Sequence, residues 1–266
     1  MSNMKIVVIG GTGRIGGKLV DILRCEGQLV VSASPSVGIN TVTGEGLEGA
    51  LRQATVVVDV SDAPSLDKGA AATFFERSGR NLIAAGRAAG VRHHVILSVV
   101  GTDRLQASAY FRAKMIQERL VRESGTPFTI LRSTQFFEII SAIAQEGANP
   151  DVVVPLTTVQ PVSSRDLARK LADLATGRPL NRIVEVAGPE RFRLDYLATE
   201  VLTAYEDPRR IIADPHEPYF GAPLTDETLL PGGDAMIGSR RFEDWLRDSL
   251  MTEIPHRYPL IPVRSR

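Results

Sequence analysis

A tyrosine and a lysine four residues apart are the side chains of this sequence best suited to acid–base chemistry. Tyr110 and Lys114 fall in a stretch with helical character, so their spacing places the phenol and the ammonium on one helix face within about 6 Å. A neighbouring ammonium stabilises a phenolate and lowers the pKa of the phenol. Ser98 ends the preceding apolar run. Because open α/β sheets bind ligands outside the carboxyl ends of their strands, we expect Ser98 beside the pair.

A glycine-rich run near the start of the chain predicts a phosphate-binding turn. It follows an apolar run at 6–9, precedes a helical stretch, and fits both G-x-G-x-x-G from Gly11 and G-x-x-G-x-x-G from Gly10. Such glycines permit positive φ, let backbone N–H groups approach a phosphate, and allow close helix packing. The helix N-terminus adds partial positive charge. We therefore expect a dinucleotide pyrophosphate at this turn, contacted by Gly10, Thr12, Gly13, Arg14, Ile15 and Gly16.

The segment after the second predicted strand favours NADP(H) over NAD(H). An NAD-selective site places Asp or Glu about 20 residues beyond the glycine turn, on the adenosine ribose. Here Ser36 stands at that position, and residues 28–44 contain no acid. Ser32, Ser34 and Ser36 alternate along the strand and its exit, and Arg14 is a cation for a 2′-phosphate. Turn chemistry around Pro35 is the alternative role for these serines, and no Arg or Lys follows the strand.

Short β-branched runs alternate with helical stretches over the first half of the chain, as in a doubly wound parallel sheet of Rossmann type. Helices are expected at about 15–25, 46–53, 69–89 and 107–124. Several strands are apolar on both faces, which indicates helices on both sides of the sheet. The strands are expected at residues 5–9, 28–32, 55–60, 94–98 and 128–131. His93 and His94 enter the fourth strand on the side away from ligands, where we expect surface residues.

The regularity weakens after Arg132, and we interpret residues 1–266 as a single α/β domain with a small C-terminal substrate lobe. That lobe is expected mainly from about 134–150 and 190–250. Gln135, Phe136 and Phe137 follow a strand end, where they line a substrate pocket or pack in the core. The loop that carries His216, Tyr219 and Phe220 is a candidate lid.

Composition and charge exclude several classes of function. The 31 basic and 31 acidic residues balance, so nucleic acid and anionic membranes are not expected partners. Cys25 is the only cysteine, which excludes an intrachain disulfide and any C-x-x-C site, and we expect it to be buried. No metal-hydrolase, glycosidase or P-loop motif is present, and no metal is expected. We expect a cytoplasmic protein with a small-molecule substrate and leave homo-oligomerisation open.

Taken together, these residues resemble the short-chain dehydrogenase/reductase superfamily, specifically its atypical NmrA-like branch, which is similar to NAD(P)-dependent epimerases. The resemblance covers the first half of the chain densely and extends loosely towards residue 190. It rests on Gly10, Gly13 and Gly16, on Asp59 and Ser61, on 81–98, on Tyr110 and Lys114, and on 127–136.

The resemblance implies an NAD(P)H-dependent oxidoreductase that transfers hydride between nicotinamide and a small carbonyl or quinone-like substrate. It implies proton transfer by Tyr110, a ribose contact and pKa depression by Lys114, and a hydrogen bond from Ser98 to the substrate oxygen. It also implies cofactor contacts at Asp59 and Ser61. The sequence departs from the family at Phe75, where many relatives have a proton-relaying asparagine. A non-catalytic NAD(P)-binding redox sensor and a sugar-nucleotide epimerase or dehydratase remain alternatives.

Overall fold

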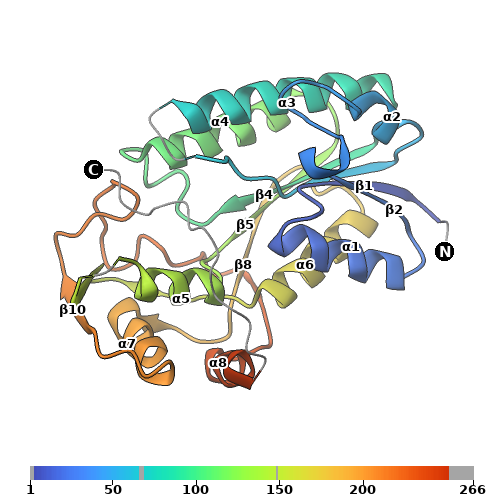
Figure 1. Ribbon diagram of the computed structural model, residues 1–266. Helices are drawn as coiled ribbons and strands as arrows, with labels where there is room; N and C mark the ends of the chain where they lie inside the picture. Colours follow the sequence, from blue (N-terminus) through green and yellow to red (C-terminus); the bar gives the residue numbers. More distant parts are fainter. Residues whose placement is uncertain (1–2, 66–68, 148, 252–266) are drawn as a thin grey trace.

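The computed structural model describes residues 3–65, 69–147 and 149–251, and a seven-stranded sheet forms its centre (Figure 1). The strand order is β11-β8-β5-β4-β3-β1-β2, and every pair is parallel. This arrangement confirms the expected doubly wound sheet. The strands are β1 (Lys5–Ile9), β2 (Leu29–Ala33), β3 (Val56–Asp59), β4 (His93–Val99), β5 (Phe128–Ser133), β8 (Ile183–Ala187) and β11 (Met236–Ile237).

Helices cover both faces of the sheet (Figure 1). Ile6 and Val8 of β1 pack with the helices α1 and α6, whereas Val7 and Ile9 pack towards α2 and α3. Strands buried on both faces need apolar side chains at successive positions, which explains the continuous apolar runs. The helices are α1 (Arg14–Cys25), α6 (Ser164–Thr176), α2 (Leu47–Leu51), α3 (Ala70–Ala88) and α4 (Ala109–Glu123), the last packed on α3.

The order of the strands creates a binding crevice at the carboxyl edge of the sheet. The chain passes from β1 to β2 on one side and then returns to place β3 on the other side of β1. Such a reversal separates the loops that leave the two strands, so ligands of open α/β sheets bind there. The glycine turn follows β1, and Asp59 ends β3.

The remaining described elements form a layer at one side of this sheet (Figure 1). Its core contains Phe137 and Trp245, whose ring centroids are 5.6 Å apart, and Phe242, 5.4 Å from Phe137. Small sheets join β10 to β6 in parallel and β7 to β9 in antiparallel fashion. The elements are η1 (Pro35–Val37), near β2, and α5 (Phe137–Gln145), β6 (Asp151–Pro155), β7 (Thr158–Val159), β9 (Phe192–Arg193), α7 (Leu194–Ala204), β10 (Arg210–Asp214) and α8 (Phe242–Met251).

The expectation that His93 and His94 lie on the surface is wrong. Both are buried because β4 runs between β3 and β5 and helices cover it. The Nε2 atom of His93 is 3.0 Å from the Oγ1 atom of Thr129. Burial and the neighbouring imidazole of His94 lower the pKa of His93 to about 4. The folded protein therefore holds His93 in its neutral form.

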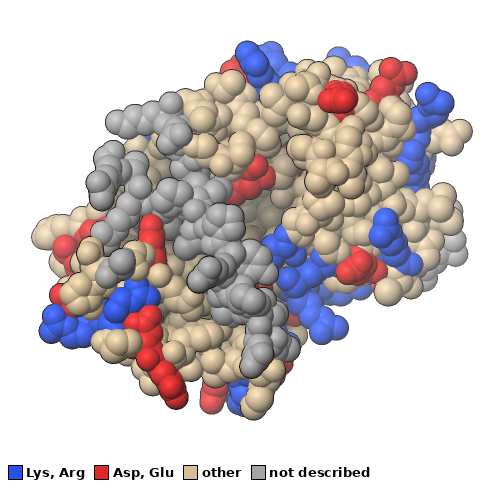
Figure 2. Space-filling view, in the orientation of Figure 1, with Lys and Arg blue, Asp and Glu red and all other residues tan. Residues whose placement is uncertain are grey.

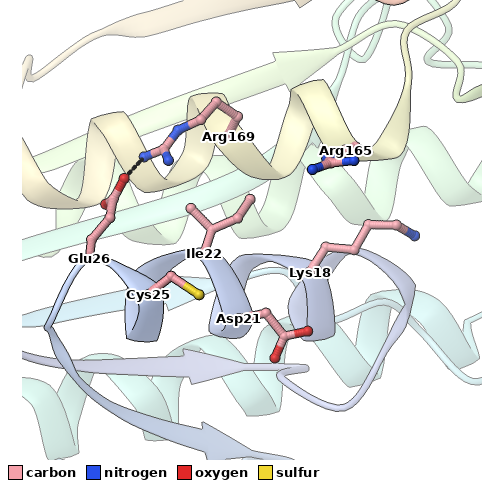
Figure 3. A pocket seen from close by; sticks show the side chains of 7 residues that line it. All are labelled: Lys18, Asp21, Ile22, Cys25, Glu26, Arg165 and Arg169. Atoms are coloured by element: carbon pink, nitrogen blue, oxygen red, sulfur yellow. Dashed lines mark ion pairs between the residues drawn. The ribbon is translucent and has the colours of Figure 1, made fainter.

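The expectation of a buried Cys25 is also wrong, because its side chain is exposed in a groove between α1 and α6 (Figure 3). Across the groove, Arg169 pairs with Glu26 at 2.5 Å. Lys18 and Arg165 extend from the two helices near one end of the groove (Figure 3). Among the described helices, none is long and apolar enough to cross a bilayer.

Candidate active site

The glycine turn between β1 and α1 has the geometry that a bound diphosphate requires. Gly10 has a φ of +78° and donates its N–H to the carbonyl of Ala33 at 2.8 Å. A Cβ atom at Gly10 would lie 3.0 Å from the backbone nitrogen of Ser61, and one at Gly16 would overlap the carbonyl oxygen of Gly10. Gly13 is the N-cap of α1. Gly10, Gly13 and Gly16 therefore act as turn, helix start and close-packing point, although Gly11 is also tightly packed, against Ser32.

The first turn of α1 is suited to a negatively charged group. Thr12 and Gly13 are exposed, whereas Ile15 and Gly16 are buried beneath them. No side chain caps this helix, and its first turn contains no acidic residue. Backbone N–H groups at a helix N-terminus bind anions, and the helix dipole adds to the attraction. Arg14, the first residue of α1, adds a cation. These residues fit the pyrophosphate of a dinucleotide.

Asp59 braces the end of β3 beside the glycine turn. Its Oδ1 atom accepts hydrogen bonds from the backbone N–H of Ser61 at 3.0 Å and from the Ser61 hydroxyl at 2.6 Å. Its Oδ2 atom accepts a third from the Nε2 atom of Gln117 at 2.9 Å. The structure thus places Ser61 against Gly10 and pairs Asp59 with Ile9 of β1, with the Asp59 carboxylate bound to protein donors.

The three serines after β1 differ in their surroundings. Ser32 lies beneath Gly11 and is half-buried, Ser34 is buried, and Ser36 is exposed in η1. The hydroxyls of Ser34 and Ser36 lie 2.8 Å apart. Ser36 is therefore the serine most accessible to a cofactor at this edge.

Tyr110 lies at the start of α4, within a group of aromatic rings. Its hydroxyl donates to the Oδ2 atom of Asp62 over 3.4 Å. Its ring stacks on that of Phe220, with centroids 5.5 Å apart, and meets Phe111 edge-on at 5.4 Å. Enclosure, and then the nearby carboxylate of Asp62, raise the pKa of Tyr110 well above its usual range. The spacing with Lys114 had predicted a lowered pKa, and the position of the Lys114 amine explains the difference.

The amine of Lys114 points into the protein. It donates to the carbonyl of Leu97 at 2.8 Å and to the Oε1 atom of Gln117 at 2.5 Å, and it is 4.6 Å from the ring centre of Phe75. Burial lowers the pKa of Lys114, against the attraction of Asp62 and other carboxylates. Phe75 therefore contributes a ring face beside this amine, at the position where the family resemblance had implied an asparagine.

Ser98 is part of a buried network that the sequence analysis missed. Its hydroxyl donates to the Oε1 atom of Glu118 at 2.6 Å. Arg132 binds the same carboxylate through Nε at 2.9 Å and Nη2 at 2.8 Å, and it also pairs with Asp103 at 3.0 Å. Burial opposes the charge of Arg132, but the Glu118 carboxylate raises its pKa overall. Arg132 is therefore held in its charged form.

A sequence signal for this network did exist along α4. Tyr110, Lys114, Gln117 and Glu118 recur at intervals of four, three and one residues. Such intervals place them on one helix face, and the last three are buried. A polar stripe on the face that packs against a sheet predicts a buried hydrogen-bond network.

Gln135, Phe136 and Phe137, the three residues expected at the substrate pocket, have different surroundings in the structure. Phe137 belongs to the core of the C-terminal layer, and Phe136 is half-buried. Gln135 is buried beside the phenol of Tyr219, and neither its Nε2 nor its Oε1 atom has a hydrogen-bond partner among the described residues. A buried, unpaired amide is costly, so Gln135 is the strongest of the three as a ligand-binding group.

The molecular surface is hollowed at the carboxyl edge of the sheet (Figure 2). The hollow lies between the side of the molecule that carries α3 and α4 and the N-terminal end of α1, where Lys and Arg side chains gather (Figure 2). Among the described residues, no three His, Cys, Asp or Glu side chains are grouped as metal ligands.

Comparison with known proteins supplies the family. A family model described as NAD(P)H-binding matches residues 10–178. A reductase of Streptomyces griseus, named for (4-alkanoyl-5-oxo-2,5-dihydrofuran-3-yl)methyl phosphate, is 30% identical over 202 residues, which are 70% of this chain and 68% of that protein. The photosystem II assembly factor Ycf39 of Cyanophora paradoxa is 24% identical over 204 residues, and the chain spans 64% of its length, with 70% of this chain covered.

Solved structures of low sequence identity share the fold. A dTDP-4-dehydrorhamnose reductase from Bacillus anthracis, in complex with NADP, aligns with a TM-score of 0.72 at 11% identity, over 95% of this chain and 99% of that one. The UDP-N-acetylglucosamine 4-epimerase from Bacillus cereus aligns with a TM-score of 0.71 at 14% identity, over 96% and 100% of the two chains.

Proposed function

The chain belongs to the NAD(P)H-binding family and is an NAD(P)-dependent oxidoreductase; from this premise we propose that it reduces a small carbonyl or quinone-like compound with NADPH. The observation that carries the proposal is the placement of Tyr110 at the same sheet edge as the glycine turn. Asp62, the acceptor of the Tyr110 hydroxyl, follows three residues after the end of β3, which lies beside that turn.

The cofactor site favours NADPH over NADH. Residues 28–44 carry no acidic side chain that would repel a 2′-phosphate. Exposed Ser36 offers a hydroxyl at the end of β2, and Arg14 begins α1 with a cation. Phosphates are stabilised by such donors and charges, so the extra phosphate of NADPH gains contacts here that NADH does not. The glycine turn holds the pyrophosphate that both cofactors share.

The phenol of Tyr110 has the protonation state that a proton donor in a reduction needs. Its pKa lies above the ordinary value of a tyrosine, so the phenol carries its proton at neutral pH and can serve as a general acid. Bound NADPH supplies the hydride. As negative charge develops on the substrate oxygen, Tyr110 donates its proton to that atom, and the nearby Asp62 carboxylate keeps the hydroxyl oriented until the substrate arrives. Lys114 contributes positive charge from beneath the site, with its amine held by Leu97 and Gln117.

Gln135 and Ser98 are the remaining polar groups proposed for the substrate. The Gln135 amide offers an unpaired donor and an unpaired acceptor. The family resemblance implies a hydrogen bond from Ser98 to the substrate oxygen. To form it, the Ser98 hydroxyl must give up its hydrogen bond to Glu118. The proposed substrate lobe is formed mainly by about 134–150 and 190–250. The Streptomyces relative is named for an oxo-dihydrofuran compound, a ring that bears carbonyl oxygen, and this supports the proposed substrate class.

The test is NADPH oxidation with a panel of carbonyls and quinones, together with the variant Tyr110→Phe. We expect at least one compound of the panel to be reduced, and we expect the variant to lose at least about a hundredfold in kcat. Its affinity for NADPH should stay within about twofold in calorimetric titration, because the glycine turn, and not the Tyr110 hydroxyl, is proposed to hold the pyrophosphate. Tyr196→Phe, in an exposed tyrosine of α7, is the matched control. Full activity of Tyr110→Phe would remove the general acid from the proposal.

A redox sensor that binds NAD(P) without chemistry is a second candidate, favoured by one observation. The hydroxyl of Ser98 and the amine of Lys114 both point to partners inside the protein, and Phe75 occupies the relay position. A sensor would keep bound NADPH unreacted with every compound of the panel. Its protease-cleavage pattern would also differ between NADP⁺ and NADPH, whereas a simple reductase without partners needs no such difference.

A further inference from the structure

A tight turn with an unusual residue lies against Tyr110. Tyr219 and Ala222 exchange two backbone hydrogen bonds, of 2.8 and 3.0 Å, and Phe220 and Gly221 form the tip between them. The φ angles of the two tip residues are +50° and +79°. Positive φ at both central positions is the requirement of a type I′ turn, for which Asn-Gly is the preferred pair.

Phenylalanine is a poor residue for the first of these two positions. A bulky side chain rarely adopts positive φ, because its Cβ crowds the backbone. Strained residues of this kind persist where the surrounding structure holds them, and they concentrate at ligand sites. Asparagine would form the same turn with less strain. We therefore infer that contacts of the Phe220 ring account for the phenylalanine at this position.

The strained turn places the Phe220 ring flat against the proposed proton donor. The ring stacks on Tyr110 with an interplanar angle of 27° and meets Phe111 edge-on, at 6.0 Å between centroids. Both Phe220 and Tyr110 are only half-buried. Tyr219, the preceding residue, is buried beside the unpaired Gln135 amide. One face of the Phe220 ring is covered by Tyr110, so a compound whose carbonyl reaches the Tyr110 hydroxyl would meet the opposite face of that ring.

We propose that Phe220 determines substrate specificity at this site: its ring is a flat wall that selects planar, conjugated carbonyl compounds over saturated ones. The inference rests on the proposed function, because it takes Tyr110 as the group that meets the substrate carbonyl. A flat conjugated ring contacts an aromatic face over its whole area, whereas a puckered ring contacts it at a few atoms. A ring–ring contact of this kind changes affinity by about threefold to tenfold.

The experiment measures binding without turnover. Protein loaded with NADP⁺, which has no hydride to donate, is titrated calorimetrically with duroquinone and with tetramethylcyclohexanedione. The second compound carries the same carbonyls on a saturated ring, and full methylation of duroquinone blocks addition of the exposed Cys25 thiol. We expect the wild type to bind duroquinone more tightly. Phe220→Ala should weaken duroquinone binding about threefold to tenfold and leave the affinity for the saturated compound within about twofold.

Two further variants separate the ring from the turn. Phe220→Asn removes the ring but suits positive φ, so it should lose the same duroquinone affinity as Phe220→Ala and melt at a higher temperature than that variant. Phe192→Ala removes a ring of the same size, stacked on Tyr196 with centroids 6.1 Å apart, and should change neither affinity.

Any of the following results would overturn the inference. The first is equal weakening of both compounds in Phe220→Ala, which would make the ring a packing element. The second is tighter duroquinone binding in that variant, which would make the ring a cover over the site. The third is wild-type affinity in Phe220→Asn, or no measurable binding of duroquinone to any form. Failure of the proposed function has a different signature: no NADPH is consumed, while duroquinone affinity still depends on Phe220.

Discussion

Acidification is expected to destabilise this protein through His93, a residue of the central sheet. Its pKa is about 4 in the folded protein, against 6.5 as the ordinary value. Above about pH 6.5 the imidazole is neutral in both the folded and the unfolded chain, and its contribution to stability is fully present. As the pH falls, the unfolded chain binds a proton that the folded chain excludes, and stability is lost until about pH 4.

The magnitude follows from the width of this window. Each pH unit between the two pKa values changes the free energy of unfolding by about 1.4 kcal/mol. The full loss attributable to His93 is therefore about 3 kcal/mol, and about 2 kcal/mol of it is lost by about pH 5. A domain with a typical net stability of about 5–15 kcal/mol loses a substantial share of it.

Urea unfolding between about pH 7 and about pH 5 measures this effect. Trp245 is the only tryptophan and lies in the core of the C-terminal layer, so its fluorescence reports unfolding there. His93→Gln removes the titrating group. Between about pH 7 and about pH 5, the variant should therefore lose about 2 kcal/mol less of its free energy of unfolding than the wild type loses. His216→Gln, in an exposed loop residue, is the control and should keep the wild-type dependence. Equal pH dependence in the wild type and His93→Gln would refute the reasoning.

Three further predictions concern the cofactor turn and the buried ion pair. Gly16→Ala places a methyl group on the carbonyl oxygen of the glycine turn and should weaken NADPH binding at least about tenfold in calorimetry, whereas Gly17→Ala, with no heavy atom within 4 Å of the added carbon, should leave it unchanged. Ser36→Asp should weaken NADPH binding more than NADH binding, because the new carboxylate repels the 2′-phosphate; equal losses would place the phosphate elsewhere. Glu118→Gln removes the buried ionic partner of Arg132 and leaves only the more exposed Asp103, so it should lower the free energy of unfolding by about 3 kcal/mol in urea.

The first five strands of the central sheet could be predicted because their signals are local, whereas the two-residue strand β11 was not predicted. The strand at 5–9 is apolar at residues 6–9, and the glycines after it satisfy a backbone requirement that the structure shows at Gly10 and Gly16. The helix that carries Tyr110 and Lys114 was also predicted, since its boundaries follow from periodicity and a terminal glycine.

The contacts of the candidate site could not be predicted in the same way. The direction of the Lys114 amine depends on Leu97 and Gln117, and the hydroxyl of Ser98 depends on Glu118. These contacts join residues on different elements, and helical spacing cannot choose among several acceptors on the facing sheet. The burial of His93 was missed for a related reason: β4 is central in the sheet, and strand order is not a local property.

The hydrogen-bonded chain through Asp59 has a consequence for how mutations combine. Ser61 at the glycine turn is bonded to Asp59, Asp59 to Gln117, and Gln117 to Lys114 beneath the proposed acid. Removal of any one member leaves its neighbours with unmet bonds in a dry interior. Substitutions at Ser61 and Lys114, which are distant in sequence, will therefore have non-additive effects on the free energy of unfolding. A substitution in this chain of hydrogen bonds will lower both the affinity for the dinucleotide and the rate of proton transfer from Tyr110.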